Sequence, residues 1–250
     1  MSKTLRELVR FLPGSDQTLM VYFGEEISLE GHARVVRFLR LLEREPLEGV
    51  RNLHPGYCSV MVKFNALRWT HAELEGVLRE YLARSAGLEL PAPREVEIPV
   101  CYGGEFGPDL GDVCAANGVT TERAIQMHRG AEYLVYFLGF VPGFAYLGRV
   151  ERGAGARTEA KTAGRKNSPA ALRMARLAVP RKLVPAGSVG IADAQTGVYP
   201  FATPGGWRLI GRTPLKMFRG ETGESLLEIG DRVRFAAISP ERFAELEHAR

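Results

Sequence analysis

The stretch from Val184 to Phe218 constrains the fold of this chain more than any other, because its six glycines and four prolines fix the shape of the backbone. Glycine can adopt positive φ angles and allows close backbone approach, while proline fixes φ and removes a hydrogen-bond donor. Between them lie two short apolar runs of strand composition, Val189–Ala192 and Trp207–Ile210. The pattern predicts short strands joined by rigid turns. Turns of this kind, carrying a few polar groups, are typical of binding sites.

Composition sets the broad class of protein. A chain of 250 residues can form one large domain or two ordinary ones, and 45% hydrophobic with 25% charged residues is typical of a soluble globular protein. The net charge of +4 is mild and carries no nucleic-acid motif. Three separated cysteines favour a reducing compartment. Without a signal peptide or a long apolar run, we expect a cytoplasmic protein that contacts neither nucleic acid nor membrane.

The first part of the chain alternates strand and helix patterns. The order β-α-β-β-α-β predicts a ferredoxin-like domain over residues 1–92, although the last strand could belong to either side of the boundary near Pro91. The expected elements are strand Thr18–Phe23, helix Leu29–Arg44, strands Val50–Leu53 and Tyr57–Phe64, a helix with capping-box spacing from Thr70, and strand Arg94–Tyr102.

Residues 93–250 predict a second, β-rich domain. Two short helices, Pro108–Asn117 and Thr121–His128, precede a strand at Glu132–Phe137 and the many short strands that follow Val184. Few helices with many short strands suggest a closed or nearly closed β-barrel. At the helix ends we expect Asp109 to satisfy free backbone donors, and His128 to be favoured by the helix dipole.

Two arginines are candidate ligand-binding residues, since Arg181 follows Pro180 and Arg212 follows Gly211. A guanidinium held on stiff backbone suits bidentate binding of a carboxylate, carbamate or phosphate, and a structural ion pair is an equal alternative. Gln195 and Tyr199 lie on the QTGVYP turn, where they could donate to an amide or lactam carbonyl. The predicted substrate-binding set is Arg181, Gln195, Tyr199, Arg212 and Thr213.

Aromatic residues supply the predicted walls of this pocket or a partner surface. Pro142, Phe144, Tyr146 and Trp207 are the candidates, with a core role as the alternative for Trp207. The Pro142-Gly143-Phe144 turn either lines the pocket or docks a partner.

Several catalytic motifs are absent from the sequence. It contains no Walker A motif, no dinucleotide fingerprint and no metal-ligand spacing, so no metal site is expected. Ser188 lies in a near match to G-x-S-x-G, but the helix which that motif requires does not follow, and a turn role is preferred. No catalytic residue is predicted.

Six blocks of sequence carry a resemblance to a known family. VEIPVCYGGEFGPDL, YFLGFVPGFAYLG, VPAGSVGIA, QTGVYP, TPGGW and LIGRTPLKMF occur in this order, and together they resemble the carboxyltransferase C/D family. The resemblance runs from about Val96 to Phe235 and is weaker before Val96. Members include the 5-oxoprolinase B subunit, allophanate hydrolase subunit 1 and the KipI-type kinase inhibitor. For residues 93–250 the resemblance implies a cyclophilin-like barrel.

The resemblance implies a non-autonomous subunit of an ATP-dependent enzyme that processes an amide or lactam. Its implied partner is a sister subunit resembling the 5-oxoprolinase C subunit or allophanate hydrolase subunit 2. Its implied substrate is a small anionic or amide molecule, and its implied cofactor is ATP with Mg. The alternatives are a KipI-type inhibitor that blocks a sensor histidine kinase, or a scaffold for the partner. One segment departs from the family: the basic insertion at about 149–176 predicts a loop, with a basic lid over an anion as the alternative.

Overall fold

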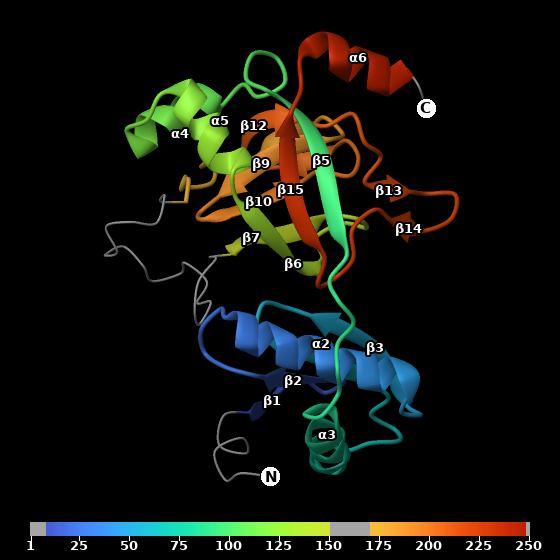
Figure 1. Ribbon diagram of the computed structural model, residues 1–250. Helices are drawn as coiled ribbons and strands as arrows, with labels where there is room; N and C mark the ends of the chain where they lie inside the picture. The colour runs from blue at the N-terminus through green and yellow to red at the C-terminus, as the bar shows by residue number, and fades with distance from the viewer. Residues whose placement is uncertain (1–8, 151–170, 249–250) are drawn as a thin grey trace. The chain divides into compact units, whose positions relative to one another are not determined.

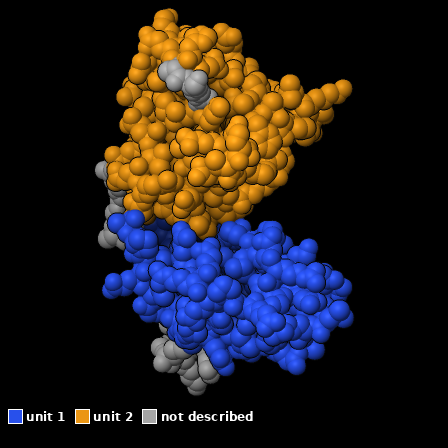
Figure 2. Space-filling view, turned by 90° about the vertical axis from the view of Figure 1, so that its right-hand side faces the viewer, with its two compact units in different colours: residues 1–92 blue, residues 93–250 orange. Residues whose placement is uncertain are grey.

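The computed structural model describes residues 9–150 and 171–248. The chain divides into two compact units, residues 1–92 and 93–250 (Figure 2). Most of the predicted basic insertion, residues 151–170, lies outside the described residues. Within the described part of the chain, no helix has the length and apolar character needed to cross a membrane.

In its described residues, unit 1 is a four-stranded antiparallel sheet with two helices (Figure 1). The strand order is β1-β2-β4-β3, and α2 packs against β3, β4 and α3. The elements are β1 (Arg10–Ser15), β2 (Thr18–Tyr22), α2 (Leu29–Arg44), β3 (Val50–Pro55), β4 (Ser59–Phe64) and α3 (His71–Ser85).

The sequence patterns account for these elements. In α2, Val35, Phe38 and Leu42 are buried, as a stripe at helical spacing requires. Helix α3 begins at the predicted capping box, in which Thr70 Oγ1 accepts from Glu73 N (3.3 Å) and Glu73 Oε2 accepts from Thr70 N (2.9 Å). Period-two burial along β4 fixes which face of the strand meets the core.

The predicted βαββαβ order is wrong in its last strand. β5 (Glu95–Tyr102) pairs with strands of unit 2, and β1 occupies the sheet edge beside β2. β1 gave no sequence pattern because RFLPGS is almost entirely exposed and contains a proline and a glycine. β5 is tied to unit 2 by Arg94, whose Nη2 lies 2.6 Å from the buried carboxylate of Asp231.

Unit 2 contains a closed seven-stranded barrel, which confirms the predicted barrel. Its strand order is β10-β7-β6-β15-β5-β12-β9, with β15 and β5 parallel and the other pairs antiparallel. The barrel strands besides β5 are β6 (Glu132–Leu138), β7 (Ala145–Val150), β9 (Ser188–Ala192), β10 (Gln195–Val198), β12 (Arg208–Arg212) and β15 (Arg232–Ala237).

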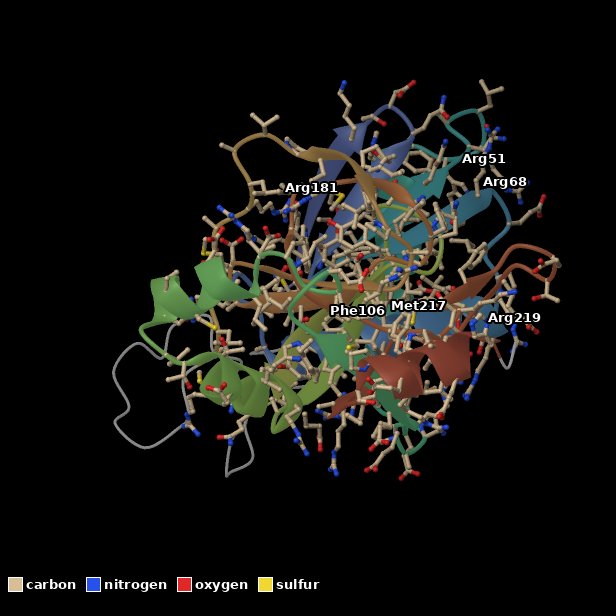
Figure 3. The ribbon with its side chains drawn as sticks, turned by 90° about the horizontal axis from the view of Figure 1, so that it is seen from above. Arg51, Arg68, Phe106, Arg181, Met217 and Arg219 are labelled. Atoms are coloured by element: carbon tan, nitrogen blue, oxygen red, sulfur yellow. The ribbon has the colours of Figure 1, made fainter. Side chains whose placement is uncertain are left out.

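Short elements surround the barrel. Helices α4 and α5 lie together on one side of it and α6 lies beyond one end (Figure 1). At that end Phe106 meets Phe243 of α6 with ring centroids 4.7 Å apart (Figure 3). The two predicted helices before the barrel are confirmed. The elements are α4 (Leu110–Asn117), α5 (Thr121–Arg129), β8 (Arg181–Val184), β11 (Thr203–Gly205), β13 (Phe218–Arg219), β14 (Glu224–Ser225) and α6 (Pro240–His248).

The glycine-rich stretch keeps neighbouring backbones close together. Gly187 has φ 79°, and a Cβ at this position would lie 2.2 Å from the Thr213 carbonyl oxygen. Thr213 N donates to the Gly187 carbonyl at 2.9 Å. Glycine is required here both by the positive φ and by the lack of space for a side chain.

His128, at the end of α5, is buried in a chain of hydrogen bonds. Thr196 Oγ1 donates to the Gly190 carbonyl (3.0 Å), so it accepts from His128 Nε2 (3.0 Å). Nδ1 then accepts from the Tyr102 hydroxyl (2.7 Å). Burial lowers the pKa of His128 to about 3, which makes the imidazole neutral at pH 7. The expectation that the helix dipole favours His128 is therefore wrong, since that effect requires a charged ring.

We predict that His128 makes the fold sensitive to mild acid. Its folded pKa of about 3 lies below the usual 6.5, so the unfolded chain binds the extra proton and stability is lost as the pH falls from 6.5 towards 3. Between pH 6.5 and 5 the wild type should lose about 2 kcal/mol more unfolding free energy than His128→Gln. Urea denaturation of both proteins at the two pH values measures the difference. Equal losses would contradict the assignment.

Candidate functional site

Asp109, just before α4, joins three elements of unit 2. Its Oδ1 accepts from Arg181 Nη2 on β8 (2.7 Å), and its Oδ2 accepts from Leu209 N on β12 (2.7 Å). Asp109 N donates in turn to the Leu209 carbonyl (2.9 Å). No side-chain capping bond to α4 is formed. The prediction that Asp109 satisfies the free donors of its own helix is therefore wrong, because both carboxylate oxygens accept hydrogen bonds from distant strands.

Three arginines gather near the start of α4, and we call them the arginine cluster: Arg176, Arg181 and Arg208. Asp112, one helical turn after Asp109, accepts from Arg208 Nη1 (2.9 Å). The Arg176 guanidinium lies 5.7 Å from the centroid of the Trp207 ring. Arg181, which is labelled in Figure 3, lies on the side of the barrel near α4, because it pairs with Asp109. The cluster thus combines residues from β8, β12 and the segment before β8.

The arginine cluster has donors that the described residues do not satisfy. Arg181 Nη1 and Arg208 Nε are buried and have no hydrogen-bond partner in the described ranges. Arg181 and Arg208 are each paired with one aspartate, whereas Arg176 has no carboxylate partner among the described residues, so one positive charge is left. Buried polar groups are normally hydrogen-bonded, and the planar arginine fork matches carboxylate and phosphate oxygens. The site is therefore suited to binding a small anion.

An aromatic core lies beneath the cluster. Phe144 makes edge-on contacts with Tyr199 (centroids 5.1 Å apart) and with Trp207 (5.4 Å). Tyr146 stacks on Phe137 at 4.4 Å and meets Trp207 edge-on. Phe144, Tyr199 and Trp207 are at most 4% exposed, so they form a packed core rather than open pocket walls.

Tyr199 takes part in the site only indirectly. Its hydroxyl accepts a hydrogen bond from Trp207 N (3.4 Å). Burial raises the pKa of Tyr199, while this hydrogen bond and the nearby Arg176 and Arg181 guanidinium groups oppose the rise. Among the predicted substrate-binding residues, Arg181 and Tyr199 therefore share one neighbourhood, in which Arg181 forms the ion pair named as its structural alternative.

Arg212 and Thr213 belong to a different neighbourhood. Arg212 Nε donates to the Ala186 carbonyl (2.8 Å), and its guanidinium lies 5.6 Å from the centroid of the Phe243 ring. Thr213 is buried, and its hydroxyl accepts from Leu215 N (3.2 Å). Both residues connect the β12 end to the turn before β9.

Gln195 lies in a third place, a small and partly open hollow of the surface. His128, Arg149 and Thr196 also line it, whereas Arg181, Tyr199, Arg212 and Thr213 do not. The structure thus distributes the five predicted residues over three neighbourhoods, and their role in substrate binding stays a prediction. Pro142 lies in the turn between β6 and β7, close to Phe144.

Sequence reasoning missed Arg176, Arg208 and Asp112 as members of the site. The two aspartates in PDLGD are three residues apart at a helix start, which places them on one helical face. That spacing was available from the sequence, but the arginines that they meet come from distant strands.

The arrangement does not fit a Mg site. Asp109 and Asp112, the carboxylates of the cluster, are both paired with arginine. Across residues 9–150 and 171–248, no group of three or more His, Cys, Asp or Glu side chains could hold a metal ion. The carboxylates of the arginine cluster therefore do not fit a Mg ion.

We predict that Asp109 stabilises unit 2 far more than Asp112. Asp109→Asn weakens a buried pair and should lower the free energy of unfolding by about 2–3 kcal/mol, somewhat less than the usual cost for a fully enclosed pair because Arg181 is 29% exposed. The matched control is Asp112→Asn, whose carboxylate is 62% exposed, and it should cost under about 1 kcal/mol. Urea denaturation checks both, and similar losses would contradict the asymmetry.

Comparison with known proteins places this chain in a family. Residues 9–227 match the model described as carboxyltransferase domain, subdomain C and D. The chain is 40% identical over 235 residues to the 5-oxoprolinase B subunit of Bacillus subtilis, covering 90% of each protein. It is 47% identical over 159 residues to the 5-oxoprolinase B subunit of Escherichia coli O157:H7, covering 63% of this chain and 64% of the relative.

Solved structures agree with this placement. TTHA0988 superposes with a TM-score of 0.69 at 32% identity, covering 89% of this chain, which spans 40% of the TTHA0988 chain. Urea amidolyase of Kluyveromyces lactis gives 0.72 at 17% identity, covering 95% of this chain and 15% of the enzyme, and this likeness shows the fold alone. This chain therefore belongs to the family of carboxyltransferase domains, subdomains C and D.

Proposed function

We propose that this chain is a non-autonomous subunit of an ATP-dependent 5-oxoprolinase, which opens the lactam of 5-oxoproline to glutamate. The match to the 5-oxoprolinase B subunit over 90% of both proteins supports this assignment. A sister barrel protein of the 5-oxoprolinase C type completes the enzyme. ATP enters this proposal through the family resemblance.

The observation that supports a substrate site on this chain is the unpartnered donor of Arg181. Asp109 holds Nη2, which fixes the plane of the guanidinium and leaves the buried Nη1 without a partner in the described ranges. A substrate carboxylate that entered the space beside Nη1 would accept from a guanidinium that the Asp109 hydrogen bond restrains. Arg176, exposed over Trp207, is placed to add a second charge.

The proposed contribution of this chain is positioning. It fixes the anionic end of the substrate, while the groups that activate the lactam carbonyl and supply the phosphoryl donor belong to the partner or to the rest of the complex. Holding the reactants in one geometry lowers the entropic cost of the reaction and supplies rate without a catalytic group on this chain.

We also propose finer assignments for the topology of the two units. The barrel is cyclophilin-like in topology, and units 1 and 2 are two domains with a boundary near residue 92. Unit 1 is a ferredoxin-like variant in which β1 takes the edge position expected of the final strand. We further propose a cytoplasmic location.

We predict that the reconstituted pair releases glutamate only when both ATP and 5-oxoproline are present. Arg181→Lys keeps the charge opposite Asp109 but loses the second donor, so the KM for 5-oxoproline should rise about 10–100-fold, the range for a charge-assisted hydrogen bond. Arg219→Lys is the control, because Arg219 is 67% exposed and lies on the opposite side of the view in Figure 3. Its KM should not change.

Two results would overturn different parts of this proposal. An active complex whose KM is the same in Arg181→Lys would remove the arginine cluster as the substrate site and leave the function standing. A well-formed complex that does not turn over 5-oxoproline in the presence of ATP would remove the function itself. Inhibition of a histidine kinase by this chain alone would then support the KipI-type alternative.

A further inference from the structure

The guanidinium of Arg208 has one complete edge of donors that no described residue uses. Its Nη1 donates to Asp112 Oδ2 (2.9 Å). Nη1 lies on the same side of the guanidinium as Cδ, so Nε–H and Nη2 together form another edge of the group. Neither atom of that edge has a hydrogen-bond partner among the described residues, and Nε is buried. A buried donor without a partner requires an explanation, and a ligand is one.

The free edge of Arg208 has a specific chemical complement. It carries two roughly parallel N–H groups and no acceptor, so it is satisfied by a group with two acceptor atoms side by side. Carboxylate and phosphate groups have such a pair of oxygens. A carboxamide has one oxygen and one NH2 group, so it would set a donor against a donor and leave a buried N–H unpaired. The edge therefore favours an acid over the corresponding amide.

Hydrogen bonds connect Arg208 with the unpartnered donor of Arg181. Leu209, the next residue on β12, donates from N to Asp109 Oδ2 (2.7 Å), and Asp109 Oδ1 accepts from Arg181 Nη2 (2.7 Å). One carboxylate thus joins Arg181 to the backbone beside Arg208. Asp112, which holds Arg208, lies one helical turn after Asp109 on the same face of α4. Both arginines are therefore held at the start of one helix.

Resting on the proposed function, we infer that Arg208 determines substrate specificity by holding the carboxylate of 5-oxoproline side-on through Nε and Nη2. The side chain of Arg208 is 20% exposed, which gives a small ligand access to part of the guanidinium. A carboxylate offers about four acceptor sites, so it can also accept from Arg181 Nη1. Arg208 thus reads the acid group of the substrate, and Arg181 supplies a further donor to it.

Arg208→Lys tests the inference in the reconstituted pair when it is combined with a change in the ligand. Lysine keeps the charge opposite Asp112 but loses the two-donor edge, so the KM and Kd for 5-oxoproline should rise about 10–100-fold. The kcat should change less than KM, because this contact is present before the reaction. Replacing the ligand carboxylate by a carboxamide should weaken binding to the wild type by a similar factor, about 10–100-fold. The same replacement should cost about tenfold less in Arg208→Lys, and titration calorimetry measures each Kd.

Arg68→Lys is the matched control. Arg68 also pairs with an exposed carboxylate, that of Glu48 at 2.7 Å, but it belongs to unit 1 (Figure 3). Its Kd for the acid and for the amide should equal the wild-type values. Thermal unfolding of Arg208→Lys separates a loss of binding from a loss of fold. The comparison of the two ligands on the wild type needs no substitution, so it tests the specificity even where the variant is unstable.

The outcomes separate this inference from the proposed function. Equal weakening of both ligands in Arg208→Lys would indicate a structural role and overturn the inference, as would equal wild-type affinity for acid and amide. Turnover of 5-oxoproline that is independent of Arg208 would also overturn it and leave the proposed function standing. A complex that prefers the acid through Arg208 but does not hydrolyse it would reject the function and keep the carboxylate site. Tighter Arg208-dependent binding of inorganic phosphate would assign the edge to a phosphoryl group instead.

Discussion

The buried carboxylate of Asp109 is the interaction on which the candidate site depends. Residue 109 holds the start of α4 against β12 through two hydrogen bonds with Leu209 and holds β8 through Arg181. β8 pairs only with β11 in the described structure and lies outside the barrel, so it lacks the ladder of bonds that fixes the barrel strands. A charged hydrogen bond from a rigid helix start supplies the missing constraint. The position of Arg181 within the arginine cluster therefore follows from one side chain.

The small aromatic core connects that site to the turn between β6 and β7. Phe144 contacts Phe140 of this turn and also contacts Trp207, over whose ring the Arg176 guanidinium lies. Edge-on aromatic contacts are directional as well as apolar, so these rings hold one another in defined orientations. Gly205 shows how tightly this core is closed, because a Cβ there would lie 2.3 Å from the Tyr199 hydroxyl. Trp207, over which Arg176 lies, is therefore held in place by a closely packed core.

Local sequence patterns predicted most of the helices and strands. They did not predict which distant strands and side chains pair with one another. The stripe in α2, the capping box at Thr70 and the closed barrel all followed from periodicity and turn residues. β1 was missed because an exposed edge strand has no buried face to mark it, and the sheet to which β5 belongs was left open because strand composition does not name a partner. The prediction for Asp109 was wrong for the same reason, because its partner Arg181 lies 72 residues away in the sequence.

Arginine at position 181 can form a structural ion pair and present a donor to a ligand at the same time. The sequence allowed either a structural ion pair or a ligand contact, and the geometry allows both at once. A guanidinium presents donors on two edges of a rigid plane, so the edge that binds Asp109 fixes the direction of the other. Lysine carries the same charge on a flexible stem and could satisfy Asp109 alone. The ion pair is therefore what orients the free edge, and losing it would disorder the site before any ligand arrived.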